Sequence, residues 1–146
     1  MEKELLNSEK QLLLVDLCGR LPYDVKCKIE MWKGYDICTI FNINSIGYVE
    51  ILEDSDTNGV NIENIKPYLF PLSSMTDEQL SKLRMEHDKD IKNMVICIKK
   101  CSEGDNSLQG KNISYHGVDW CNRNHYDYRG LIQKGLAIDA TGLNIY

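Results

Sequence analysis

Residues 115–130 hold most of the side chains in this sequence that could bind a ligand or take part in a reaction. The stretch contains two of the three histidines, one of the two tryptophans, three of the eight tyrosines and two of the four arginines. Tryptophan, tyrosine and arginine are enriched in binding hot spots, because each combines a large contact area with a hydrogen-bonding group. We therefore expect a ligand- or partner-binding surface formed by six residues, Trp120, His125, Tyr126, Asp127, Tyr128 and Arg129.

Arg129 is the predicted anchor of this surface. Its planar guanidinium offers paired N–H donors that suit a phosphate or a carboxylate, and an acidic protein needs such a group to hold an anionic ligand. His125 and Asp127 would tune the charge of the site near neutral pH. On this hypothesis, Arg129→Ala abolishes binding and leaves the melting temperature nearly unchanged.

Two catalytic interpretations of the same stretch have less support. His125 and Asp127 could act as a general base and its orienting carboxylate. His116, Asp119 and His125 could instead hold a metal ion in a hydrolase or phosphodiesterase. No serine or cysteine nucleophile motif accompanies them and nothing in their spacing goes beyond chance, so binding is favoured over catalysis. A structural interpretation also stays open, in which the rings anchor a segment that is short of aliphatic residues.

The composition of the chain is that of an ordinary globular protein. Its 146 residues are 42% hydrophobic and 27% charged, which is enough to bury a core without disulfides or metal ions. With 17 basic and 22 acidic residues the net charge is −5, which disfavours nucleic acid or an acidic membrane as a partner. The six cysteines include no Cys-x-x-Cys pair and indicate reduced, inert thiols. The N-terminus lacks signal-peptide features, so we expect a cytoplasmic protein, and no cofactor is expected.

Apolar periodicity predicts an α+β protein that begins with a helix over residues 8–18, opened by a capping box of Ser8 and Gln11. Alternation of apolar and polar residues predicts four short strands, over 25–31, 35–43, 46–52 and 60–62. A helical turn and an extended segment follow at 65–69. Several short strands in close succession favour a small SH3-like antiparallel β-barrel over residues 23–72.

The second half of the chain is predicted to be helical. Residues 77–101 place apolar side chains along one seam, which favours one long helix, with a strand over 94–98 as the alternative. Such a helix outruns one side of a small barrel, so we expect a homo-oligomer that buries its seam at Leu83, Ile91, Met94 and Ile98. A short helix is predicted over 118–124. Residues 1–75 and 76–146 would then form two parts that pack as one unit.

Three parts of the sequence together resemble a group of small proteins from phages, prophages and mobile elements of gut Bacteroides-like bacteria. The resemblance is carried by residues 16–23, by residues 65–69 with 71–76, and by Asp119-Trp120 with His125, 127–132 and 135–137. It implies a phage-borne accessory protein in the host cytoplasm, such as a counter-defence factor that binds a host protein or sequesters a small anionic nucleotide signal. A phage structural or assembly protein is the other function that it implies.

Overall fold

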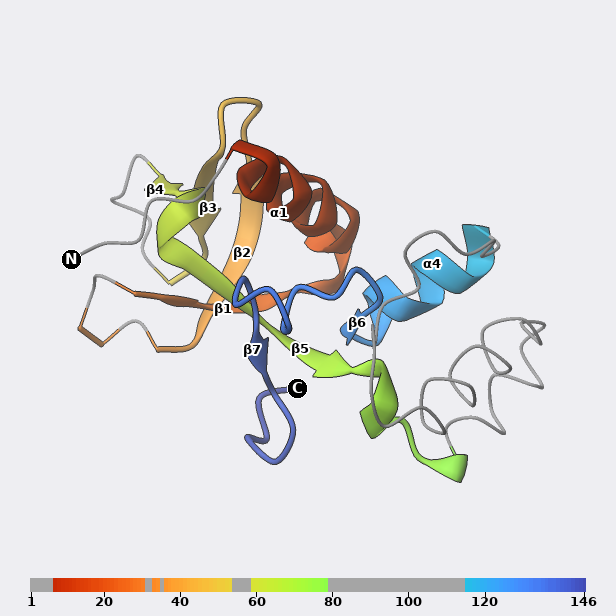
Figure 1. Cartoon of the computed structure of the whole chain (residues 1–146). Coiled ribbons are helices and arrows are strands. Elements are labelled where there is room, and N and C mark those ends of the chain that lie inside the picture. The colour runs from red at the N-terminus through yellow and green to blue at the C-terminus, as the bar shows by residue number, and fades with distance from the viewer. Residues whose placement is uncertain (1–6, 31–32, 35, 54–58, 79–114) are drawn as a thin grey trace.

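The computed structural model describes the chain except for residues 1–6, 31–32, 35, 54–58 and 79–114, and it describes residues 115–117 by their backbone alone. A helix, α1 (Asn7–Arg20), precedes the first five strands of a mixed sheet, and a second helix, α4 (Tyr115–Arg123), comes before its last two strands (Figure 1). Both helices were predicted from the sequence, within a few residues of their ends. Between the helices and strands lie three single turns of 3-10 helix, Leu21–Tyr23, Ile62–Asn64 and Leu72–Ser74.

The first helix buries a face that contains two charged residues. Leu13 and Leu17 are fully buried, and so are Asp16 and Arg20 on the same side of the helix. Val15, by contrast, is 45% exposed. The buried face of α1 therefore carries an ion pair as well as apolar residues.

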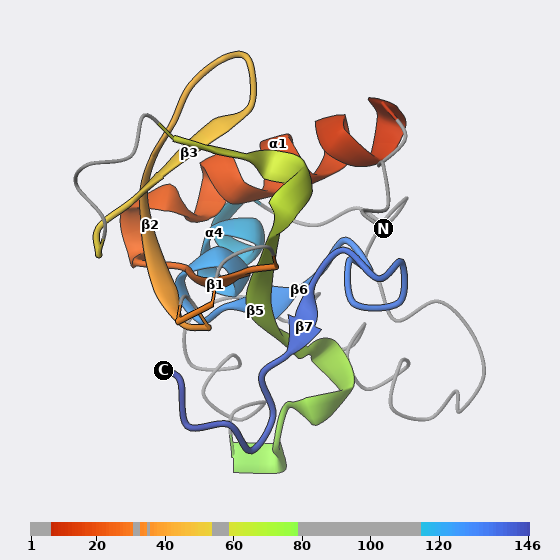
Figure 2. The same cartoon turned by 90° about the vertical axis from the view of Figure 1, so that its left-hand side faces the viewer.

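The sheet contains seven strands in the order β4-β3-β2-β1-β5-β6, and β7 pairs with β5 off this path. The strands are β1 (Lys26–Ile29), β2 (Cys38–Ile43), β3 (Tyr48–Ile51), β4 (Val60–Asn61), β5 (Ile65–Pro71), β6 (Tyr126–Asp127) and β7 (Ile138–Asp139). The first four form an antiparallel meander, and β5 returns antiparallel to β1. Helix α1 lies across one face of this sheet (Figure 2), where Leu13 and Leu17 join the core.

The predicted SH3-like β-barrel is wrong, because the sheet does not close. Its path runs from β4 to β6, and in the described part of the chain these two end strands do not pair with each other. The reason lies in β5. Its first half pairs antiparallel with β1, whereas its second half takes parallel partners, β7 at Tyr68 and Leu69 and β6 at Phe70 and Pro71. The C-terminal segment therefore extends the sheet, through strands of two residues that carry no periodicity.

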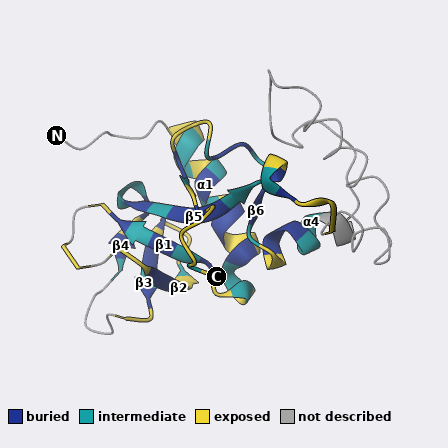
Figure 3. Ribbon diagram, turned by 90° about the horizontal axis from the view of Figure 1, so that it is seen from below, coloured by how far each residue is buried: buried dark blue, intermediate teal, exposed yellow. Residues whose placement is uncertain are grey.

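The predicted helical C-terminal part is also wrong for residues 115–146. They contain the single helix α4, followed by two short strands and turns. Leu131, Leu136 and Ala137 from these turns belong to the same core cluster as α1 and the meander. Figure 3 shows buried residues running from the sheet through α1 and into this C-terminal segment.

Helix α4 packs closely against α1. A side chain at Gly19 would bring a Cβ atom within 3.1 Å of Nδ2 of Asn122, so glycine at this position permits the close approach of the two helices. This contact fixes the position of α4, and with it the start of the segment that follows α4.

Several sequence predictions lie outside the described residues. From residue 79 onward, the long helix expected over 77–101 is outside the described residues. The predicted self-association seam is outside them too, at Leu83, Ile91, Met94 and Ile98. Of the four described cysteines, Cys27, Cys38 and Cys121 are buried and Cys18 is exposed, and none of the four is in a disulfide. No helix in the described part is both long and apolar enough to cross a bilayer.

Candidate ligand-binding cleft

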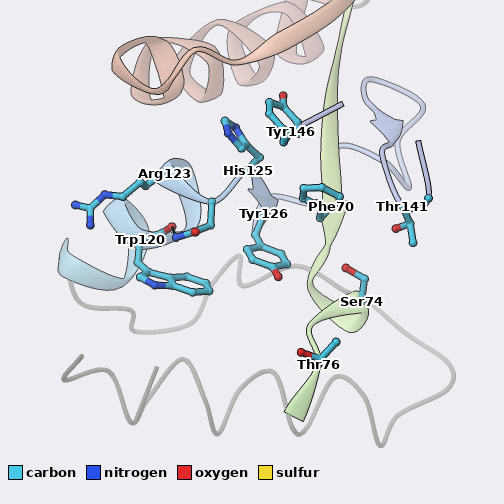
Figure 4. Close-up of a pocket in the computed structure, with 11 residues that line it drawn as sticks. Phe70, Ser74, Thr76, Trp120, Arg123, His125, Tyr126, Thr141 and Tyr146 are labelled. Atoms are coloured by element: carbon cyan, nitrogen blue, oxygen red, sulfur yellow. Dashed lines mark hydrogen bonds between the residues drawn. The ribbon is translucent and has the colours of Figure 1, made fainter. Parts of the chain in front are cut away.

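A cleft of about 750 Å³ opens between the end of β5, helix α4 and the C-terminal tail (Figure 4). Small-molecule sites typically enclose about 300–1,000 Å³, so this cleft has the size of a ligand site. One side is aromatic, and hydroxyl-bearing residues lie on the other side in Figure 4. The rings belong to Phe70, Trp120, His125, Tyr126 and Tyr146, and the polar residues are Ser74, Thr76, Arg123, Asn124 and Thr141.

The junction between α4 and β6 positions Trp120 and Tyr126. The two rings stack with their planes 7° apart and their centroids 5.4 Å apart. The chain turns between them at His125, whose φ of +63° is in the left-handed region. Its amide donates to Asn122 O at 3.3 Å, and its carbonyl accepts from Phe70 N at 2.8 Å. Glycine is the usual residue at such a helix exit, so the imidazole is held here at some cost in backbone strain.

The His125 ring lies against the ring of Tyr146. Their centroids are 3.6 Å apart and their planes differ by 11°. Tyr146 is fixed in turn, because its hydroxyl donates to Tyr68 O at 2.7 Å and accepts from Lys26 N at 2.8 Å. Burial and the positive charge of Arg20 lower the pKa of His125 to about 4, so the imidazole is neutral at pH 7. Its Nδ1 atom is buried and has no hydrogen-bond partner in the part of the chain that the structure describes.

Arg123 is the cationic side chain among the described lining residues, and a neighbouring carboxylate balances its charge. Its Nη2 donates to Oδ2 of Asp119 at 2.8 Å, and the other carboxylate oxygen of Asp119 accepts from the Tyr23 hydroxyl. This hydrogen bond to Asp119 raises the pKa of Tyr23. Arg123 is 58% exposed on the rim, so the pair is of the weak, solvent-screened kind.

A buried ion pair lies behind the cleft. Arg20 donates to both carboxylate oxygens of Asp16, at 2.8 and 3.2 Å, and to the carbonyl of Tyr126 at 2.7 Å. Burial acts to lower the pKa of Arg20, but Asp16 outweighs it and the pKa is raised. Because one guanidinium holds both α1 and β6, the ion pair fixes the backbone that carries the Tyr126 ring.

Arg129 belongs to this buried cluster and does not line the cleft. Its Nε lies 3.2 Å from Oδ1 of Asp16, and its guanidinium carbon lies 5.0 Å from the centroid of the Tyr128 ring. The guanidinium carbon of Arg20 also lies over this ring, 5.2 Å from its centroid. A cation over an aromatic ring is stabilised by the ring quadrupole, so Tyr128 and Asp16 together balance two guanidinium groups.

Asp127 also has a structural role. Its carboxylate oxygens accept from Leu131 N and Ile132 N, both at 2.9 Å. These bonds hold the turn that leads into the C-terminal core. Both oxygens are occupied, so Asp127 does not orient the imidazole of His125 as a catalytic dyad would require.

The structure therefore divides the six predicted site residues into two groups. Trp120, His125 and Tyr126 line the cleft, whereas Asp127, Tyr128 and Arg129 are engaged on its far side, against α1 and the following turn. In the part of the chain that the structure describes, no three histidine, cysteine or carboxylate side chains come together as a metal site. Asp119 and His125 have separate partners, and the side chain of His116 lies outside the described residues.

The lining residues outside 115–130 were not predicted from the sequence. Phe70 and Ser74 lie more than forty residues before this stretch, and Thr141 and Tyr146 follow it. Only the pairing of β5 with β6 and β7 brings these segments together. No spacing rule would have found them.

No family model, curated protein or solved structure matches this chain. The resemblance to proteins of phages and mobile elements therefore stays a prediction.

Proposed function

We propose that this chain is a non-enzymatic binding protein that holds a small planar ligand of the nucleotide class in the cleft. The observation that carries the proposal is the aromatic side of the cleft, where Trp120 stacks on Tyr126 beside Phe70. Trp120 and Phe70 are both half-buried, so each ring is fixed and still accessible. Stacking of a base on an aromatic side chain contributes about 1–3 kcal/mol, and rigid rings bind at low entropic cost.

The arrangement favours binding over hydrolysis. General base catalysis needs a base that is oriented by a partner and lies within reach of the reacting group. His125 has no such partner at Nδ1, and the carboxylate nearest to it in the sequence, Asp127, is used by the backbone. Asp119 is likewise held by Arg123 and Tyr23.

We place this binding activity in the host cytoplasm, where a phage-borne protein could sequester a nucleotide signal. This part of the proposal rests on the sequence resemblance alone. Binding of a host protein and a role in phage assembly are the alternatives.

Titration calorimetry with ribonucleoside 5′-monophosphates tests the proposal. We expect one molecule bound per chain for at least one base, and Trp120→Ala should weaken that affinity about tenfold or more. Phe41→Ala is the matched control, because Phe41 is 49% exposed on β2 and does not line the cleft. Absence of binding by all four nucleotides, or equal affinity in wild type and Trp120→Ala, would overturn the proposal. Stoichiometric zinc or manganese in the purified protein would instead support a hydrolase.

A further inference from the structure

We propose that the cleft recognises the nucleoside part of its ligand, the base and the ribose, and takes no strong contribution from phosphate. This inference rests on the proposed function and specifies it further. It predicts that a nucleoside, its monophosphate and its triphosphate bind with similar affinity, and that removing the ribose hydroxyls weakens binding more than removing the phosphate.

The first argument is the charge of the cleft. A phosphate site ordinarily supplies several cationic or backbone N–H donors. The described lining residues supply one cation, Arg123, and Asp119 at 2.8 Å balances its charge. Arg129, the other arginine of the dense stretch, faces Asp16 behind the cleft. A ligand with two or more negative charges would therefore find no excess positive charge among these residues.

The second argument is the protonation state of the imidazole. A protonated His125 would add a positive charge to the same cleft. It is neutral at pH 7, because burial and Arg20 oppose protonation, as Lys26 does more weakly, and Asp24 only partly offsets them. A neutral imidazole therefore adds no positive charge that could attract a phosphate.

The third argument is the polar side of the cleft. Ser74 and Thr141 line it opposite the rings in Figure 4. The Ser74 hydroxyl donates to Pro71 O at 2.6 Å, and Asn124 Nδ2 donates to Trp120 O at 2.9 Å. Each side chain then keeps an oxygen that can accept a hydrogen bond. Ribose hydroxyls and base amino groups are donors that fit these acceptors, whereas an ionised phosphate offers acceptors alone.

The test compares ligands that differ by one group. Calorimetry would use the four ribonucleosides first, and then the monophosphate, the triphosphate and the 2′,3′-dideoxy form of the tightest one. We expect the nucleoside and its phosphates to agree within about threefold, and the dideoxynucleoside to bind about fivefold or more weakly. Affinity should change by less than about threefold between about 50 and 200 mM salt, because few counterions are released.

Two variants isolate the charge contribution. Arg123→Gln should change the affinity for the monophosphate by less than about threefold, as should the matched control Lys134→Gln, which removes an exposed cation that does not line the cleft. A triphosphate or monophosphate that binds about tenfold tighter than the nucleoside, with a gain lost in salt or in Arg123→Gln, overturns this inference and leaves the proposed function intact. Absence of binding by every compound overturns both.

Discussion

Residues 120–129 contain two groups of side chains with different roles. Trp120, His125 and Tyr126 line an open cleft, where a ligand can contact them. Asp127, Tyr128 and Arg129 do not line it. Asp127 accepts from two backbone amides, Arg129 pairs with Asp16, and the Tyr128 ring contacts two guanidinium groups. A cluster of aromatic and arginine residues in a sequence therefore predicts strong side-chain contacts. Only the partners of each side chain show whether it binds a ligand or stabilises the fold.

The largest effect is expected from breaking the buried ion pair. Asp16→Ala leaves Arg20 buried without its carboxylate, so the free energy of unfolding should fall by about 3–5 kcal/mol, measured by urea denaturation. Cys18→Ala, at an exposed position on the same helix, should change it by less than about 0.5 kcal/mol. A small effect of Asp16→Ala would mean that the cluster behind the cleft does not hold α1 to β6.

Asp127→Ala should lower the free energy of unfolding by the next largest amount. The substitution leaves the amides of Leu131 and Ile132 without acceptors, at about 1–3 kcal/mol. Asp127→Asn keeps one acceptor oxygen and should lose about half as much. If Asp127→Ala is as stable as wild type but loses ligand affinity, Asp127 belongs to the cleft and our division of the segment is wrong.

Arg129→Ala separates the structural interpretation from the one drawn from the sequence alone. We now expect a loss of about 1–2 kcal/mol in stability, because Asp16 loses one of two cations, and no change in ligand affinity. Arg123→Ala is the matched comparison, since its ion pair lies at the surface and should contribute less than about 1 kcal/mol. Unchanged stability with lost binding would restore Arg129 as the ligand anchor.

The last effect concerns His125 and depends on pH. Its pKa is about 4 in the folded chain and about 6.5 when unfolded. Between these values the unfolded state binds more protons, so this residue makes stability fall as pH drops from about 6.5 towards 4. His125→Gln should flatten that part of the stability curve, measured by urea denaturation at several pH values. A curve that falls as steeply in the variant would assign the loss to other groups.

Local structure was predictable because it follows from patterns within one segment. The alternation around Cys27 and Ile29 predicts a strand with that burial, and β1 has it. The capping box of Ser8 and Gln11 predicts the start of α1 within a residue. Helix α4 was found in the same way, from the residues around Trp120.

Long-range structure was not predictable, since it depends on pairings that leave no local pattern. Strands β6 and β7 have two residues each, and they decide that the sheet stays open and that Phe70 and Tyr146 meet at the cleft. The buried ion pair was missed for a related reason. Asp16 and Arg20 are charged, so a search for apolar faces counts them as exposed, and their burial requires the partners Arg129 and Tyr126 from the far end of the chain.

The most direct measurement is a set of two-dimensional ¹H–¹⁵N NMR spectra recorded while the tightest nucleoside is titrated into the protein. Our account predicts that the largest shifts occur at the indole N–H of Trp120 and at the backbone amides of Phe70, Thr141 and Tyr146, which line the cleft. The amides of Asp16, Tyr128 and Arg129 should shift little. Shifts centred on those three residues, with the cleft unaffected, would contradict the account.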